Sequence, residues 1–180
     1  MMNKARKNKG FTLVELLVVI AIIGILSAIA IPNLFKSINK AKAKKLVVEM
    51  NVVSDAITEY YLEHGTLDLK VMENSGSQSI TDHMYLKDHK ALQANFDSPI
   101  IKSPFGGWYY IEDEKNFIEL SILPMPPQGE FNGLNDYHDK VQKAVASMQT
   151  MMKMKDQIEK DSSGKIKVSD DGATIMIDKP

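Results

Sequence analysis

The sequence predicts an α+β protein. A long N-terminal helix, apolar in its first half and amphipathic in its second, packs on a small antiparallel sheet, with a further helix and a terminal hairpin in the C-terminal region. Three observations predict this fold. An apolar run at residues 11–35 leads directly into an amphipathic helical pattern that reaches residue 64. Two pairs of β-rich runs, within 108–123 and 166–177, are each joined by a short polar turn. Between these pairs, residues 136–160 have the apolar period of a helix.

Composition excludes several classes of protein. The chain has 180 residues and no cysteine, which excludes a disulfide scaffold, a thiolate zinc site and a cysteine nucleophile. Its formal net charge is −1, so it is not a uniformly basic nucleic-acid binder. The charge is segregated, however. Residues 1–10 carry four basic and no acidic side chains, residues 36–45 carry five lysines, and residues 46–180 carry 13 basic and 22 acidic side chains.

The apolar run at residues 11–35 contains one charged side chain, Glu15. As a helix it is about 37 Å long at ~1.5 Å per residue, enough to cross a hydrocarbon core of ~30 Å, so it is expected to be the transmembrane half of the long helix. A secretory signal peptide is an alternative, because Ala28-Ile29-Ala30 is a small-x-small cleavage site after a basic start. Its product would be a secreted soluble protein cleaved after Ala30. Glu15 and the helical pattern beyond the run argue against this alternative.

The junction between the basic leader and the apolar run carries a specific signature. Gly10 is followed by the large apolar Phe11, and Glu15 and Pro32 follow at fixed spacings. The stretch KGFTLVELLVVIAIIGILSAIAIPNL, residues 9–34, resembles the N-terminal segment of type IV pilins and of the pseudopilins of type II secretion. The resemblance implies the pilin fold. It also implies that a prepilin peptidase/methyltransferase cuts between Gly10 and Phe11 and methylates Phe11, while the apolar helix stays on the mature protein.

The resemblance also implies roles for residues within the helix. Glu15 is expected to guide filament assembly by pairing with the N-terminal amine of a neighbouring subunit, rather than only with the amine of its own chain. A buried carboxylate needs such a partner, and a methylated amine keeps its positive charge. Gly24 and Pro32 are expected to form a helix break, because Pro32 has no N–H to offer the Ala28 carbonyl. In relatives, the helix around such a proline becomes extended in the assembled filament.

The second half of the long helix is expected to belong to the globular part of the chain. Apolar residues at spacings of three and four turn one face of this helix toward the sheet, and Gly65 is a signal for its C-terminal end. This face contains Leu46, Met50, Val53, Ile57 and Tyr60, widened by Val47, Tyr61 and His64. The chain therefore divides into a leader at 1–10 that is removed, a transmembrane and assembly helix at 11–35, and a pilin-like globular domain at 36–180.

A basic collar lies where the two halves of the helix meet. It is either a solvated helix turn or a contact with anionic lipid headgroups before assembly. Acidic faces of neighbouring subunits could take over the second role in a filament. The acidic body beyond the collar argues against nucleic acid as its partner. The collar consists of Lys36, Lys40, Lys42, Lys44 and Lys45.

The globular domain is expected to begin, after the stem, with an irregular region at 66–103. Within it, residues 74–77 form a loop and residues 87–95 a short helix. Residues 103–107, Ser-Pro-Phe-Gly-Gly, resemble the turn through which many pilins and pseudopilins enter their sheet.

Two hairpins and a helix complete the expected domain. The first hairpin joins 108–112 to 117–123, and the second joins 166–168 to 173–177. The helix at 136–160 carries four methionines at 148–154 that suit adaptable core packing.

No catalytic, cofactor or metal site is expected. The four histidines are scattered, and the sequence contains no phosphate-binding loop or serine elbow. Asp170, Asp171 and Asp178 offer carboxylates in a region where some pseudopilins bind calcium, but their spacing matches no strong calcium loop. The terminal hairpin, which has no cysteine, must be held by packing and hydrogen bonds or by a metal.

These features predict a structural subunit of a type IV pilus or related filament. The alternatives are a pseudopilin of a type II protein secretion system and a minor tip pilin for adhesion or DNA uptake. The expected partners are the prepilin peptidase/methyltransferase, other pilin subunits in a helical filament, an inner-membrane assembly platform with its ATPase, and membrane lipid, with no small-molecule substrate. Before assembly the chain is expected to be a single-pass inner-membrane protein. After assembly it is expected to be part of a filament that is periplasmic to extracellular.

Overall fold

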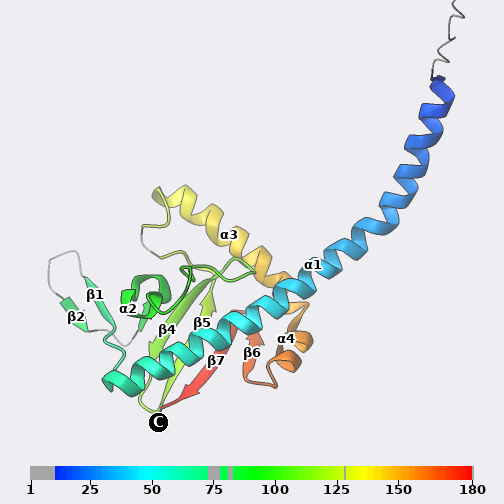
Figure 1. Ribbon diagram of the computed structural model, residues 1–180. Helices are drawn as coiled ribbons and strands as arrows, with labels where there is room; N and C mark the ends of the chain where they lie inside the picture. The colour runs from blue at the N-terminus through cyan, green and yellow to red at the C-terminus, as the bar shows by residue number, and fades with distance from the viewer. Residues whose placement is uncertain (1–10, 73–77, 81–82, 128, 180) are drawn as a thin grey trace, which may run out of the picture. The chain divides into compact units, whose positions relative to one another are not determined.

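The structure is a computed structural model that describes residues 11–72, 78–80, 83–127 and 129–179. The chain forms two compact units that divide between Ile38 and Asn39. Helix α1, Leu13–His64, contributes its N-terminal part to the first unit and its C-terminal part to the second. The second unit also holds the strands and the remaining helices (Figure 1). The α+β class predicted from the sequence is confirmed.

The C-terminal part of α1 packs through the face that its periodicity predicts. The helix ends at His64 because Gly65 adopts a left-handed conformation (φ 70°) and its N–H bonds to the Tyr61 carbonyl at 2.8 Å. Of the widening residues, Val47 is buried and Tyr61 half-buried, whereas His64 is exposed. The side chains that α1 buries belong to Ala43, Leu46, Val47, Met50, Val53, Ala56 and Ile57.

The main sheet has five antiparallel strands in the order β3-β4-β5-β7-β6. Both predicted hairpins, β4–β5 and β6–β7, are present. The second hairpin does not lie apart from the first, because β7 pairs with β5 on one side and with β6 on the other. Hydrogen bonds on both edges of β7 thus hold the C-terminal segment. The strands are β3 His83–Tyr85, β4 Trp108–Asp113, β5 Phe117–Leu123, β6 Ile166–Ser169 and β7 Gly172–Asp178.

One face of this sheet forms the core together with α1. Strand side chains alternate between faces, and the antiparallel register places the inward residues of neighbouring strands opposite each other, as with Leu120 and Ile175. The strand residues whose side chains lie on this core-facing side of the sheet are Tyr109, Ile111, Ile118, Leu120, Ile122, Ile166, Val168, Ala173, Ile175 and Ile177. Each methionine or leucine side chain that α1 buries against this face is removed from water, which stabilises the fold by about 1.5–3 kcal/mol per side chain.

The prediction of an irregular region at 66–103 is wrong in part. Three short strands lie within it: β1 Lys70–Met72 pairs with β2 Gln78–Ile80, and β3 pairs with β4. Strands of three residues are too short to show an alternating pattern, and β3 is formed by its pairing with a distant segment. The predicted loop at 74–77 lies outside the described residues.

The predicted helix at 87–95 is also wrong in detail. It divides into a 3₁₀ turn, η1 Leu86–Asp88, and a single helical turn, α2 Lys90–Gln93. His89, buried between them, caps α2: its Nδ1 accepts the Leu92 N–H at 3.2 Å, and its Nε2 lies 2.6 Å from the Leu67 carbonyl oxygen. His89 is therefore a structural residue that joins α2 to the segment after α1.

The single helix predicted at 136–160 is two helices. Helix α3, Gly133–Met152, begins three residues earlier than predicted, and α4, Lys155–Asp161, follows after a break. The Met154 N–H bonds to the Met151 carbonyl at 2.8 Å, which tightens the chain into a turn. The break reorients the chain so that Met151 of α3 and Ile158 of α4 are both buried. The methionines of this region serve core packing, as expected.

A buried tyrosine links the sheet to α1. Tyr109 of β4 is 1% exposed, and its hydroxyl donates to Glu49 Oε2 at 2.8 Å. Lys45, one turn earlier on α1, lies 3.4 Å from the other oxygen of this carboxylate. Burial, reinforced by the charge of Glu49 and by this hydrogen bond, raises the pKa of Tyr109 far above its usual range. Its neutral form is therefore favoured in the folded state.

Replacing Tyr109 by phenylalanine should lower the free energy of unfolding at pH 7 by about 1–3 kcal/mol, because Glu49 loses a hydrogen bond in a half-buried site. The native chain should also lose stability as the pH rises above about 10, where Tyr109 ionises only in the unfolded state, with a slope of about 1.4 kcal/mol per pH unit. Denaturant titrations between pH 7 and 11, followed by Trp108 fluorescence, measure both effects. An equal slope in Tyr109→Phe would contradict the assignment.

Candidate processing and assembly segment

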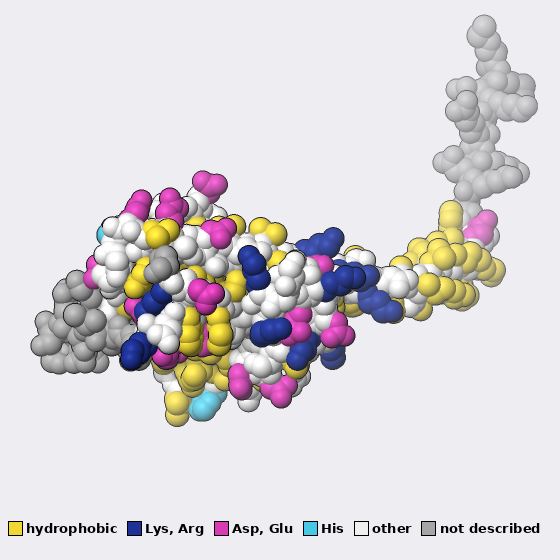
Figure 2. Space-filling view, turned by 90° about the horizontal axis from the view of Figure 1, so that it is seen from below, with side chains coloured by type: hydrophobic (Ala, Val, Ile, Leu, Met, Phe, Trp, Pro, Cys, Tyr) yellow, Lys and Arg dark blue, Asp and Glu magenta, His cyan; other side chains and the backbone are white. Residues whose placement is uncertain are grey.

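The N-terminal unit exposes its apolar side chains. From Phe11 to Phe35 every large apolar residue is solvent-exposed, and Phe11 itself is 78% exposed. Figure 2 shows these hydrophobic side chains along the N-terminal part of α1, followed along the helix by lysines. Helix α1 is long and apolar enough to cross a membrane. Such a surface needs lipid or other apolar helices to cover it.

The start of α1 is a capping box formed by Thr12 and Glu15. The Thr12 backbone N–H and its hydroxyl both donate to Glu15 Oε2, at 2.9 Å and 2.7 Å. In return, the Glu15 N–H bonds to Thr12 Oγ1 at 3.2 Å. This reciprocal pair satisfies backbone groups that a helix start leaves free. The role of Thr12 was missed in the sequence, although the Thr-x-x-Glu spacing just before an apolar run is its signal.

The capping box orients the carboxylate of Glu15, the residue that is predicted to guide filament assembly. Both hydrogen bonds from Thr12 go to Oε2. Within the described part of the chain, Oε1 of Glu15 has no hydrogen-bond partner, so it can accept a donor from another molecule. Phe11, whose amine the predicted cleavage would expose, lies at the described N-terminal end, whereas Gly10 lies outside the described residues.

The helix runs without interruption through the predicted break. Both Gly24 and Pro32 lie inside α1. A Cβ added at Gly24 would meet no atom within 4 Å, so packing within the subunit does not require a glycine there. Pro32 leaves the Ala28 carbonyl without its helical N–H donor. A break at these positions in an assembled form stays a prediction.

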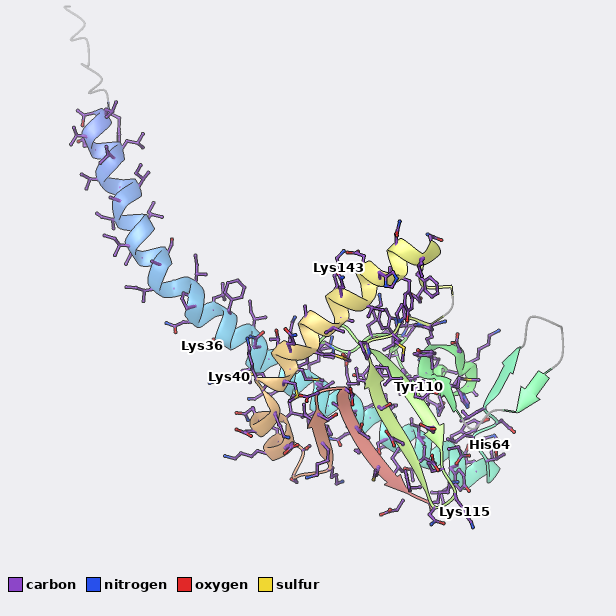
Figure 3. All side chains as sticks on the ribbon, turned by 180° about the vertical axis from the view of Figure 1, so that it is seen from behind. Lys36, Lys40, His64, Tyr110, Lys115 and Lys143 are labelled. Atoms are coloured by element: carbon purple, nitrogen blue, oxygen red, sulfur yellow. The ribbon has the colours of Figure 1, made fainter. Side chains whose placement is uncertain are left out.

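The five collar lysines differ in what they contact. Lys45 pairs with Glu49, and the Lys42 ammonium lies 5.9 Å from the centre of the Phe105 ring. The other three, Lys36, Lys40 and Lys44, are exposed and make no ion pair with any described residue; the first two are labelled in Figure 3. Three collar charges are therefore available to a partner.

No other chemical site emerges from the described residues. Among them, no three His, Asp or Glu side chains gather in a way that would hold a metal ion. Asp170 and Asp171 instead line an open hollow of about 760 Å³ together with methionines of α3.

Comparison with known proteins identifies the N-terminal segment. Residues 5–31 match the family model of the prokaryotic N-terminal methylation motif. The type IV major pilin protein of Neisseria gonorrhoeae is 42% identical over 73 residues, which are 41% of this chain and 42% of the pilin. The chain thus spans less than half the length of the curated pilins that it matches first. No solved structure matches the chain.

A second group of relatives belongs to protein secretion. The type II secretion system core protein G of Escherichia coli is 28% identical over 140 residues, which are 75% of this chain and 92% of that protein. The corresponding protein of Vibrio cholerae is 40% identical over 63 residues, 35% of this chain and 43% of its own length. The chain is therefore related to the type IV pilins and the type II secretion pseudopilins through the methylation motif that starts its long helix.

Proposed function

We propose that the protein is a structural subunit of a type IV pilus or a related filament, assembled through its N-terminal helix. The observation that carries this proposal is the apolar surface of residues 11–35, which no described part of the subunit covers. Parallel helices of other subunits would bury it. A head-to-tail contact of this kind does not close, so it produces a fibre.

Processing would prepare the helix for assembly. A prepilin peptidase/methyltransferase cuts between Gly10 and Phe11 and methylates the new amine on Phe11. This cation then pairs with Oε1 of Glu15 in a neighbouring subunit, since each charge needs a partner once the helices are bundled. Residues 1–10 act as the leader, 11–35 as the membrane and assembly helix, and 36–180 as the globular domain.

Before assembly the subunit would sit in the inner membrane as a single-pass protein. The exposed collar lysines Lys36, Lys40 and Lys44 would contact anionic headgroups, at about 1 kcal/mol per charge near the surface. A membrane platform with its ATPase would then transfer the subunit into a filament that extends from the periplasm to the exterior.

A pseudopilin of type II secretion is the second candidate. The observation that favours it is the alignment with the Escherichia coli core protein G, which covers 92% of that protein, whereas the pilin alignment covers 42% of the gonococcal pilin. Deleting the gene separates the two functions: loss of surface fibres indicates a pilus, and loss of protein export with surface fibres intact indicates a pseudopilus.

The mature N-terminus tests the processing step. Intact-mass analysis of the protein purified from its native membrane should give a chain that begins at Phe11 and carries one added methyl group. An ordinary signal peptide would be cut after Ala30, so that the mature chain begins at Ile31. A mass corresponding to Ile31–Pro180 would refute the proposed function, because the helix that buries subunits against each other would be lost.

A further inference from the structure

The solvent-facing side of the C-terminal part of α1 carries two rows of like charge. Lys40 and Lys44 are spaced by four residues, as are Asp55, Glu59 and Glu63, and all five side chains are exposed. At 100° per residue, Lys44 and Glu59 lie opposite the face that buries Met50 and Ile57 against the sheet. Lys36 continues the basic row by one further step of four in the sequence.

These rows do not stabilise the subunit itself. Like charges four residues apart destabilise a helix by a few tenths of a kcal/mol per pair. Glu59 and Glu63 also lie near the C-terminal end of α1, where the helix dipole disfavours negative charge. None of the charges in the two rows forms an ion pair within the described residues. Asp55 lines an open hollow together with two other charged residues of the domain, Asp161 and Lys165, without an ion pair to either.

We propose that the basic row of one copy pairs with the acidic row of a parallel neighbour shifted by 19 residues along the helix. This inference rests on the proposed filament. The 19-residue shift aligns Lys40 with Glu59 and Lys44 with Glu63, and it continues to Lys36 and Asp55. Shifts of 15 or 23 residues leave one member of each row unmatched. At ~1.5 Å per residue, the stagger is about 28 Å.

The geometry of the rows fits an open assembly. Residues 19 positions apart, such as Lys40 and Glu59, differ by about 100° around the helix. The two rows of one copy therefore face two different neighbours, which is a heterologous contact that propagates instead of closing. The exposed apolar side chains Val48 and Val52, at 61% and 45% exposure, lie on the same side of α1 and would be covered by those neighbours.

An antiparallel pair of helices would also bring the rows together. It would form a closed dimer, in which each copy offers its basic row to the acidic row of the other. The two arrangements differ in the size of the products that a cross-link between the rows would trap.

The absence of native cysteine makes this cross-link specific. In the full-length chain, Lys44→Cys combined with Glu63→Cys places two thiols about 28 Å apart on one helix, far beyond the Cα separation of under ~7 Å that a disulfide needs. Bonds can then form only between copies. Filaments sheared from cells and oxidised should give a ladder of multimers on a non-reducing gel. The matched control, Lys44→Cys with Asp55→Cys, has the wrong shift and should stay monomeric.

Each outcome decides between the arrangements. Intact filaments without a ladder, or with a ladder only in the control, overturn the 19-residue stagger and leave the proposed filament standing. A product that stops at dimers indicates the antiparallel pair and also overturns the stagger. If the unmodified chain forms no filaments under any condition, the proposed function itself fails.

If the cysteine variant does not assemble, charge reversal tests whether the basic and acidic rows pair between copies. Lys40→Glu with Lys44→Glu should reduce filament yield by about tenfold or more, because like charges would then face each other. Adding Glu59→Lys and Glu63→Lys to the same chain re-forms the pairs with opposite sign and should restore most of the yield. A fourfold variant that is inserted in the membrane and processed, yet assembles no better than the twofold variant, overturns the pairing.

Discussion

Replacing Glu15 by alanine should leave the protein processed and inserted in the membrane but reduce filament yield by at least about tenfold, since removing one partner of a buried charge pair is strongly destabilising. The carboxylate lies beyond the Gly10–Phe11 bond, so cleavage should depend on it only weakly. A neighbouring amine that loses this partner stays charged inside an apolar bundle. Immunoblots of the mature form, beside filament yield from sheared cells, measure the two steps separately.

The capping box makes a second substitution informative. Glutamine at position 15 can still accept from Thr12, because Gln serves at this position of a capping box as Glu does, but it carries no charge. Glu15→Gln should therefore start the helix normally and assemble as poorly as Glu15→Ala. Full assembly of Glu15→Gln would show that the cap, and not the charge, is what Glu15 supplies. A block in cleavage would instead mean that the peptidase requires the carboxylate.

Replacing Gly172 by alanine should strongly destabilise the globular domain. Gly172 opens β7 with a φ of 152°, and an added Cβ would lie 2.1 Å from the carbonyl oxygen of Ile122 in β5. That oxygen belongs to the backbone of a central strand, so it cannot move without breaking the β5–β7 pairing. A loss of about 4 kcal/mol or more is expected, a large part of the ~5–15 kcal/mol by which a typical domain is stable. Fluorescence of Trp108, the single tryptophan, reports the unfolding.

Gly164 provides the matched control. It lies in the same C-terminal region, before β6, and also has a left-handed φ of 78°, but a Cβ there would meet no atom within 4 Å. Gly164→Ala should cost only the conformational strain of about 1–2 kcal/mol. Equal losses in the two variants would mean that backbone conformation, and not the close approach of β5, makes Gly172 necessary.

The parts of the fold that sequence predicts are those whose pattern is local and long. The apolar positions of α1 from Leu46 to Ile57 recur over several helical turns. In β4 and β5, β-favouring residues lie on either side of a short polar turn. Each of these elements can therefore be predicted from its own residues. Short elements give no such pattern. The three residues of β3 become a strand because β4 offers them hydrogen bonds, and His89 is buried because Leu67 and Leu92 supply partners for its two ring nitrogens.

The candidate site shows the same division. Phe11, Glu15 and their spacing to Gly10 and Pro32 are visible in the sequence, and so is the apolar run that needs a partner. The Thr-x-x-Glu motif is a sequence signal for the Thr12 cap, which the prediction missed. The motif does not show that both donors from Thr12 converge on one carboxylate oxygen and leave the other without a partner among the described residues. Which oxygen is occupied depends on side-chain geometry that spacing does not specify.

The class of fold, the long apolar helix and the relationship to pilins and pseudopilins can all be predicted from the sequence, because each depends on periodicity or on a contiguous motif. Three features became visible in the folded structure alone: β7 inserts between β5 and β6, Tyr109 reaches across to Glu49, and Lys40, Lys44, Glu59 and Glu63 form no ion pair with any described residue on the outer side of α1. These features depend on contacts between residues far apart in the chain. Such contacts are selected by the packing of the whole domain, which no local pattern encodes.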